Sequence, residues 1–207
     1  MNQKNSFGLN KCFKDLENPI DLFREWYELA KKSEPNDPNA LALGTADEKG
    51  VPTVRMVLLK DFGDNGFVFF TNLNSVKSSA IKKNPKASMC FHWKSLLRQI
   101  RINGSVTKIK DEEADKYYLT RSYGSKVGAW VSNQSSILDS RKTLSDALNK
   151  FKEKFPEDNK LNRPSYWSGW RLIPNEIEFW LDGQNRIHER LKYLKRNRSW
   201  KKVLLYP

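Results

Sequence analysis

Cysteine and histidine are scarce in this 207-residue sequence, which limits the kinds of site it can hold. The only cysteines, Cys12 and Cys90, lack the spacing of a thiolate metal site and are too few for a disulfide framework. With His92 and His188 as the only histidines, a histidine-rich metal centre is not expected either. The sequence therefore predicts no metal ion.

Long apolar runs are also missing. The longest, such as residues 56–59 and 67–70, fall far short of the roughly 20 residues that a membrane-spanning helix requires. The first residues are polar and contain neither the apolar segment nor the cleavage site of a secretory signal. We expect a soluble, cytoplasmic protein with no membrane partner.

Acidic residues are the minority among the charged ones: 24 Asp and Glu stand against 37 Lys and Arg, a net charge of +13. A positive field attracts nucleic acids, anionic lipids and phosphorylated small molecules alike. Neither GxGxxG after a strand nor GxxxxGK[ST] occurs, which excludes the Rossmann and P-loop phosphate sites. The positive charge is dispersed and no aromatic RNA-binding signature is present, so a nucleic-acid partner is not expected.

The first half of the sequence combines a helix with short strand-like runs. After Asn18 and Pro19, apolar residues recur at helical spacing, with the asparagine as the cap and the proline in the first turn. Asn65-Gly66 is typical of a tight hairpin turn. The strands predicted here are residues 40–46, 51–60 and 67–71. Ser75 is placed to cap a short helix that runs to residue 84.

The second half repeats this mixture with longer strands. Residues 86–93 alternate apolar and polar side chains, as in a strand with one buried face. Asn103-Gly104 predicts a β-bulge in the following strand. The further predicted strands are residues 97–109, 170–173, 176–181, 186–193 and 200–205, and the predicted helices are residues 111–121 and 144–155.

Antiparallel strand signals at short spacing, interrupted by a few helices, are typical of a closed or nearly closed barrel. We therefore expect a mainly β protein with helices (α+β), in which the helices pack on an antiparallel barrel. We expect a single domain over residues 18–207. Residues 1–17 are expected to form a tail that is partly disordered or acts as a lid over a substrate.

Tyr117, Arg121 and Ser125 are the first candidate site. The tyrosine and the arginine are four residues apart on a predicted helix, so they share a face, and the serine follows a turn at Gly124. A guanidinium, a phenol and a hydroxyl are suitable donors to a phosphate. The alternative is a Tyr–Arg stacking pair on the surface of the helix.

Arg186, His188 and Arg190 are the second candidate site. They alternate along a predicted strand, so all three side chains are expected on one face. Such a face repels itself unless an anion covers it, and a histidine there is able to carry protons near neutral pH. The alternative is a solvated strand face.

A third group surrounds the start of the short helix. Thr71, Ser75, Lys77 and Ser78 gather where free backbone N–H groups and the helix dipole favour a phosphate. Ser75 as a simple helix cap is the alternative. Residues 55–60 begin with an arginine and end with a lysine, and their odd separation places them on opposite faces of a strand unless a bulge lies between them.

Taken together and in order, these segments closely resemble the pyridoxine/pyridoxamine 5′-phosphate oxidase family, flavoproteins with an FMN-binding split barrel. The resemblance covers residues 18–207. It is carried by residues 55–60 (RMVLLK), 69–72 (FFTN), 98–99 (RQ), 117–121, 128–136 (GAWVSNQSS), 178–180 (EFW) and 186–190 (RIHER). It implies an antiparallel Greek-key type split β-barrel flanked by α-helices.

The resemblance also implies the ligands and their residues. FMN would be bound by Arg55, Met56, Val57, Leu58, Leu59, Lys60, Phe70, Thr71, Lys77, Gln99, Gln134, Ser135, Trp180 and Arg190. The substrate, pyridoxamine 5′-phosphate or pyridoxine 5′-phosphate, would be held by Lys60, Tyr117, Arg121 and Ser125, with Arg186 and His188 as catalytic residues over its ring. Family members are homodimers with the flavin at the interface, so these residues would come from both chains.

The implied reaction forms pyridoxal 5′-phosphate. Hydride passes from the C4′ carbon of the substrate to flavin N5, and dioxygen then reoxidises the flavin and is released as hydrogen peroxide. We expect Arg186 and His188 to hydrogen-bond the substrate's hydroxyl or amine and to accept a proton during hydride transfer. The alternatives are a split-barrel protein that binds FMN or haem without oxidase activity, and a basic barrel that binds single-stranded nucleic acid.

Three positions depart from the family pattern. Phe70 stands where a tyrosine is usual, Val76 where an arginine is usual, and Leu204 where an arginine often precedes the last leucine. The first change removes a hydroxyl and the second removes a cation near the FMN phosphate. We therefore expect weaker FMN retention unless another basic group substitutes.

Overall fold

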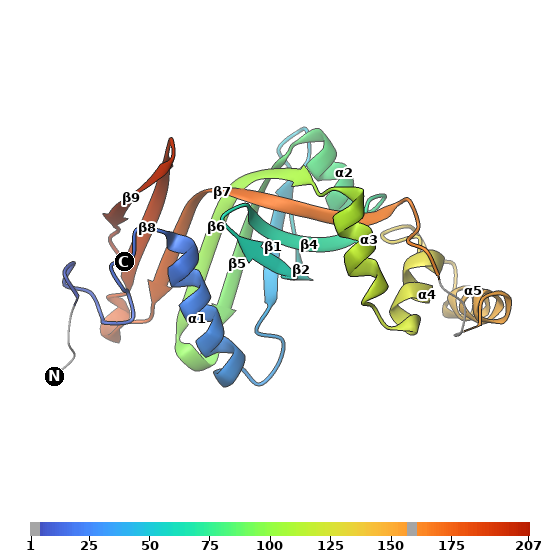
Figure 1. Ribbon diagram of the computed structural model, residues 1–207, viewed down its shortest axis with the longest axis horizontal. Coiled ribbons are helices and arrows are strands. Elements are labelled where there is room, and N and C mark those ends of the chain that lie inside the picture. Colours follow the sequence, from blue (N-terminus) through green and yellow to red (C-terminus); the bar gives the residue numbers. More distant parts are fainter. Residues whose placement is uncertain (1–4, 157–160) are drawn as a thin grey trace.

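The computed structural model describes residues 5–156 and 161–207, and its centre is one antiparallel sheet (Figure 1). The strands are β1 (Ala40–Ala46), β2 (Pro52–Leu58), β3 (Asp61–Gly63), β4 (Gly66–Asn72), β5 (Lys86–Trp93), β6 (Arg98–Lys108), β7 (Trp167–Leu181), β8 (Glu189–Arg196) and β9 (Ser199–Leu204). The helices are α1 (Pro19–Ser33), α2 (Val76–Lys83), α3 (Asp111–Leu119), α4 (Tyr123–Val131) and α5 (Arg141–Lys154), with short 3₁₀ turns at Lys94–Leu96 and Gln184–Arg186.

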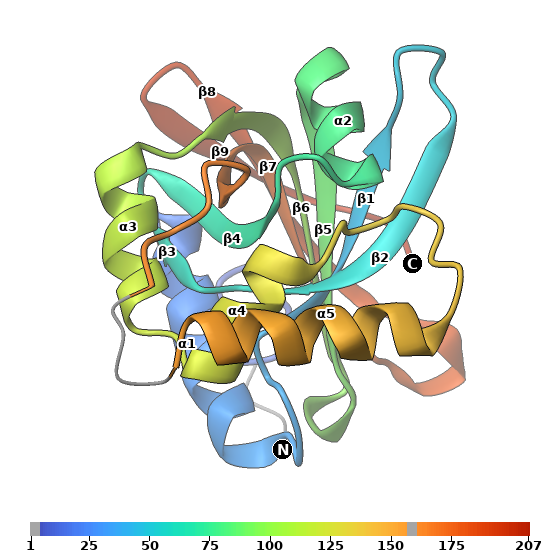
Figure 2. The same ribbon diagram turned by 90° about the vertical axis from the view of Figure 1, so that its right-hand side faces the viewer.

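The sheet curls into a nearly closed barrel (Figure 2). Its strands pair in the order β2-β1-β5-β6-β7-β4-β3, and β8 and β9 continue from β7 as a side branch. The two end strands, β2 and β3, are joined directly through Leu59 and Lys60, whose backbone N–H groups donate to the carbonyls of Asn39 and Val68. The predicted antiparallel barrel with packed helices is confirmed.

The barrel interior is apolar because its strands alternate. Ala87, Met89, Phe91 and Trp93 of β5 are buried, while the residues between them are half-buried or exposed. Phe23 of α1 packs edge-to-face on Phe91, with ring centroids 5.3 Å apart. Helix α1 therefore covers the barrel with the apolar face that its spacing predicts.

Two helix predictions need correction. The helix predicted over residues 111–121 ends at Leu119, so Arg121 lies in the turn beyond it. Gly124, expected in a turn, lies in the unpredicted helix α4. Two glycines give this segment a low helix propensity, and it is helical because Val127 and Ala129 are buried by packing. Ser75 precedes α2, but its hydroxyl donates to the Asn72 carbonyl (2.7 Å) and caps no helix N–H.

The last strands also differ from prediction. Residues 170–173 and 176–181 belong to one 15-residue strand, β7. It continues past Pro174 because the predicted bulge at Asn103/Gly104 lies directly opposite. Strand β8 begins only at Glu189, and Arg186 lies in the preceding 3₁₀ turn with φ 65°. The prediction that Arg186, His188 and Arg190 alternate along one strand is therefore wrong.

Gly104 allows the close approach of β6 and β7 at this bulge. A Cβ atom there would lie 2.0 Å from the Ile173 carbonyl oxygen. We expect Gly104→Ala to lower the free energy of unfolding by about 1–3 kcal/mol, because the backbone must shift to relieve the overlap. Gly124→Ala is the control, since nothing lies within 4 Å of its Cβ. Chemical denaturation measures both, and equal effects would contradict the close approach.

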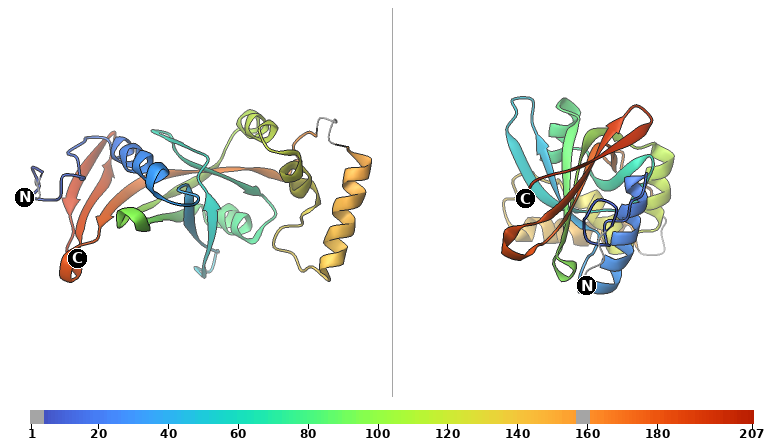
Figure 3. Two further views of the ribbon diagram at one scale, coloured as in Figure 1. Left: turned by 90° about the horizontal axis from the view of Figure 1, so that it is seen from below. Right: turned by 90° about the vertical axis from the view of Figure 1, so that its left-hand side faces the viewer.

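The segment before α1 packs at the end of the molecule formed by β8 and β9, opposite α5 (Figure 3). The Trp26 indole N–H donates to the Cys12 carbonyl (2.8 Å), and the Tyr193 hydroxyl donates to the Leu16 carbonyl (2.9 Å). Residues 1–4 of the predicted tail lie outside the described residues. Within residues 5–156 and 161–207, no helix has the length and apolar character needed to cross a membrane.

Candidate functional site

A cavity of about 650 Å³ lies between strands β2 and β4 and helices α2, α3 and α4. It is lined by residues near the C-terminal ends of β2 and β4 and by polar and aromatic residues of the other elements. The lining residues are Met56, Val57, Leu58, Lys60, Phe70, Thr71, Asn72, Lys77, Tyr117, Arg121, Ser125, Gly128, Ala129, Ser132, Gln134 and Trp167. Below, these residues are called the pocket.

The pocket is positively charged. Lys60, Lys77 and Arg121 contribute three cations, and no Asp or Glu is among the described residues that line it. Cations that face one cavity repel each other and gain from an anion placed between them. The charge arrangement therefore favours a ligand with one or more phosphate or carboxylate groups.

Lys77 is the most deeply placed of these cations. Its ammonium group donates to Gln134 Oε1 (2.9 Å), Thr71 Oγ1 (3.1 Å) and Ser75 Oγ (3.2 Å), all uncharged acceptors. Burial, and secondarily the charge of Arg55, lowers the pKa of Lys77 to about 8. Since Lys77 lies in the first turn of α2, a bound phosphate would meet a buried cation and a helix N-terminus together.

The Lys77 pKa predicts how binding of a phosphorylated ligand depends on pH. The free chain loses the Lys77 proton above about pH 8, whereas a bound phosphate favours the charged form. We expect the Kd for a phosphate-bearing ligand to be nearly constant from pH 6.5 to 7.5 and to rise by up to about tenfold per pH unit well above pH 8. Fluorescence titrations at several pH values measure this, and a Kd independent of pH up to 9.5 would contradict it.

Arg121 forms the opposite wall with three aromatic rings. Its guanidinium lies 4.5 Å from the centroid of Trp167, and its Nη2 donates to the Ser125 carbonyl (2.9 Å). Its Nε is buried with no hydrogen-bond partner among the described residues. The Phe70 ring stacks on Tyr117 (4.0 Å) and on Trp167 (5.3 Å), and the Tyr117 and Trp167 rings also stack on each other (6.2 Å). Tyr117 thus stacks on Phe70 rather than on Arg121. The Nε–H of Arg121 is a buried donor without an acceptor among the described residues.

A second group of predicted residues lies on strands β6, β7 and β8. Gln99, Trp180 and Arg190 are register partners on these neighbouring strands and form one row across the sheet. The His188 ring lies 4.6 Å from the Trp180 ring. His188 Nδ1 is 3.1 Å from an Asp182 carboxylate oxygen and 3.2 Å from the Gly183 N–H, so the loop fixes the orientation of the imidazole.

The two groups lie at opposite ends of β7 (Figure 1). Trp167, at one end, lines the pocket, and Trp180, near the other, belongs to the row. Trp180 is thirteen residues further along the extended chain, a path of at most roughly 40 Å. A single chain therefore does not bring Arg186, His188 and the row to the pocket.

Three predicted FMN residues line neither place. Arg55 donates to Thr45 Oγ1 (2.8 Å) and to the Leu43 carbonyl (3.1 Å), and Leu59 is buried in the barrel core. Ser135 lines an adjacent cavity that shares Gln134 with the pocket. Val76, 55% exposed, lines the same adjacent cavity, and Lys83 is the basic residue among the described lining of that cavity.

Sequence reasoning missed several pocket residues. Gly128, Ala129 and Ser132 come from α4 or its C-terminal cap, and no periodicity predicts that helix. Asn72 joins the pocket through its side chain, which donates to the Ser132 carbonyl (3.2 Å). Trp167 follows a loop and carries no local signal of its role.

Comparisons with known proteins agree with this geometry. Residues 30–155 match the family model described as pyridoxamine 5′-phosphate oxidase, and residues 167–207 match the one described as the pyridoxine 5′-phosphate oxidase C-terminal dimerisation region. Proteins named pyridoxine/pyridoxamine 5′-phosphate oxidase are similar over most of the chain. The one from Pelagibacter ubique is 59% identical over 208 residues, 100% of both chains, and the one from Allorhizobium ampelinum is 50% identical over 94% of this chain and 95% of its own.

Solved structures share the fold. PhzG from Burkholderia lata, in complex with tetrahydrophenazine-1-carboxylic acid, superposes with a TM-score of 0.89 at 29% identity and covers 95% of this chain and 96% of its own. A pyridoxamine 5′-phosphate oxidase-related, FMN-binding protein from Nostoc punctiforme has a TM-score of 0.74 at 15% identity, covering 93% of this chain and 99% of its own. The second likeness bears on the fold alone.

Proposed function

Because the chain belongs to the pyridoxamine 5′-phosphate oxidase family, we propose that it oxidises pyridoxamine 5′-phosphate and pyridoxine 5′-phosphate to pyridoxal 5′-phosphate with bound FMN. The observation that carries the proposal is the pocket itself, with three cations, an aromatic wall and no carboxylate among its described lining residues. Both ligands of this reaction carry a phosphate. A pocket of this charge suits them.

The described residues fit FMN. The buried Lys77 ammonium has only uncharged acceptors around it, so a phosphate supplies the anion that it lacks. Thr71 and Gln134 lie within hydrogen-bond distance of the same ammonium. Residues 56–58 of β2 line the pocket beside them and would contact the flavin. Arg55 and Ser135 lie next to this group and complete the proposed phosphate end.

The other wall fits the phosphate of the substrate. Lys60, Tyr117, Arg121 and Ser125 line the same cavity. The unpaired Arg121 Nε–H is buried, and a buried donor without a partner is costly. A substrate phosphate in reach of the guanidinium would satisfy it. Two bound phosphates would balance the charges of Lys60, Lys77 and Arg121, which no Asp or Glu balances among the described lining residues.

A second copy of the chain supplies the rest of the site in this proposal. The match to a dimerisation region covers residues 167–207, which include Trp180, Arg186, His188 and Arg190. On β2, the side chains of Val54 and Met56 are 71% and 63% exposed. Exposed apolar side chains beside a pocket are typical of a surface that a partner covers. Each homodimer would then hold two sites, with FMN at the interface.

The residues have separate tasks in the reaction. FMN, when bound, would supply the two-electron oxidation at the C4′ carbon and pass the electrons to dioxygen, which would leave as hydrogen peroxide. With the amine substrate, water would then replace the nitrogen, which would leave as ammonia. Arg121 and Lys60 hold the substrate phosphate and so fix the position of the ring. Arg186 and His188 lie over the substrate from the partner chain. There they hydrogen-bond its 4′ hydroxyl or amine, and His188 accepts a proton.

An anaerobic spectrum tests this function. The purified protein is reconstituted with FMN, and pyridoxine 5′-phosphate is added without oxygen. We expect the visible flavin band to bleach and then to recover when air is admitted. We also expect pyridoxal 5′-phosphate to accumulate. A bound flavin that does not bleach with either the alcohol or the amine substrate would overturn the proposed substrate but keep the cofactor.

A further inference from the structure

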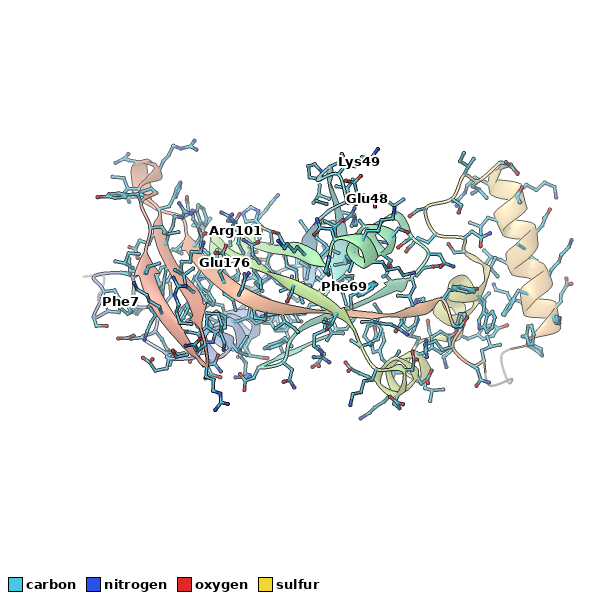
Figure 4. All side chains as sticks on the ribbon, turned by 90° about the horizontal axis from the view of Figure 1, so that it is seen from above. Phe7, Glu48, Lys49, Phe69, Arg101 and Glu176 are labelled. Carbon is cyan, nitrogen blue, oxygen red and sulfur yellow. The ribbon has the colours of Figure 1, made fainter. Side chains whose placement is uncertain are left out.

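A buried carboxylate lies on the outer face of the sheet, beside the row of Gln99, Trp180 and Arg190. Glu178 of β7 is only 5% exposed, although its neighbours in sequence, Ile177 and Phe179, face the barrel core. Its face also carries Arg101 and Glu176, which extend from the adjacent strands β6 and β7 (Figure 4). A buried acid is costly unless it is paired, so its partners indicate its role.

Arg190 is the main partner of Glu178. Its Nε donates to Glu178 Oε1 at 2.8 Å, its Nη2 lies 2.7 Å from the same oxygen in an ion pair, and its Nη1 donates to the Tyr206 carbonyl at 2.8 Å. Arg101 Nη1 lies 3.6 Å from Glu178 Oε2 and adds a weaker charge contact. The guanidinium is therefore fixed from two sides.

A count of donors shows what remains for a ligand. A guanidinium has five N–H groups, and in Arg190 two hydrogen bonds and the close Nη2–Glu178 ion pair engage three of them. One N–H on Nη1 and one on Nη2 remain. The charge of Arg190 is already paired with that of Glu178, whereas no carboxylate is among the described residues that line the pocket with Lys77, Lys60 and Arg121. Arg190 thus differs from the phosphate-binding cations in its electrostatics.

We propose that Glu178 is a positioning residue that presents Arg190 as a two-N–H donor to an uncharged oxygen or nitrogen of the flavin, and not to its phosphate. This inference rests on the proposed FMN function. A neutral Arg–Glu pair gains little from an anion, but a fixed pair of donors selects a carbonyl, hydroxyl or ring nitrogen by geometry. The phosphate end is then left to Lys77 and its neighbours.

Comparing FMN with riboflavin, the same flavin without phosphate, separates the two kinds of contact. We expect Glu178→Gln to raise the Kd of FMN and of riboflavin by the same factor, about tenfold, so that their ratio stays as in the unmodified protein. The bound flavin's visible spectrum should also shift. Glu176→Gln is the matched control: this carboxylate lies on the same strand and face but pairs with Lys192 and Asn103. It should change neither Kd.

Unchanged affinities for both flavins in Glu178→Gln would overturn the inference, and so would a loss confined to FMN, which would place Arg190 on the phosphate. If Glu178→Gln does not fold, as judged by circular dichroism, Arg190→Lys replaces it. That variant keeps the positive charge but lacks the paired N–H donors of the guanidinium, and it should weaken the binding of both flavins by the same factor. If the unmodified protein binds neither flavin, the proposed function fails first.

Discussion

Replacing Lys77 by methionine is expected to weaken FMN binding by about 10- to 100-fold, the effect of losing one or two charge-assisted hydrogen bonds worth about 1.5–3 kcal/mol. The methionine keeps most of the buried apolar stem and removes only the ammonium. That ammonium is buried, and no anionic side chain is among its hydrogen-bond partners in the described part of the chain. The variant is therefore expected to fold as stably as the unmodified chain, or more so.

Flavin fluorescence titration measures the change, with Lys82→Met as the control. Lys82 lies on the same helix, α2, but is exposed and does not line the pocket. Its replacement removes the same formal charge and should change the Kd less than about threefold, since exposed charges are screened by salt. Riboflavin binding should be the same in both variants. Equal losses of FMN affinity in the two would show that overall charge, not Lys77, binds the phosphate.

Local sequence patterns predict much of this fold because the barrel has one buried face per strand. The alternation in β5 and the capped helix α1 appear as predicted. The bulge at Asn103/Gly104 does too. A tight hairpin turn also forms between β3 and β4, but its two central residues are Asp64 and Asn65, and Gly66 is the first residue of β4. In each case the deciding interaction is local: a turn conformation, a cap, or the choice between two faces.

The errors occur where tertiary contacts override local preference. Helix α4 contains two glycines and is held by the burial of Val127 and Ala129. Strand β7 passes through Pro174 because the bulge opposite removes the need for its N–H. The turn before β8 requires a glycine at position 183. A Cβ atom there would lie 1.9 Å from the Ile187 carbonyl oxygen. None of these contacts is visible in a short window of sequence.

The site shows the same division. Spacing alone brings Tyr117, Arg121 and Ser125 together as donors to an anion, and the structure places all three around the pocket. Period-2 spacing gave the wrong geometry for Arg186, which lies in a turn. Spacing also carries no sign that one set of residues faces the pocket while the other lies at the far end of β7. Only the assembled strand reveals that separation.

Two inactive variants with defects in different parts of the site are expected to restore activity when they form a heterodimer. In the proposed dimer, the pocket of one chain meets Arg186 and His188 of the other. Arg121→Met alters the pocket, and His188→Ala alters the far end of β7. Each homodimer should lose about 100-fold or more in kcat/KM, since each carries the same defect in both sites. In a heterodimer, both defects fall in one site and the other site is intact.

The most direct test is therefore the oxidase activity of the purified heterodimer. The two variants are coexpressed with different affinity tags, and only dimers that carry both tags are collected. We predict about half of the unmodified dimer's rate of pyridoxal 5′-phosphate formation, from one intact site of two. A heterodimer no more active than the better of the two parent homodimers would contradict the account, because it would mean that each site is built from a single chain.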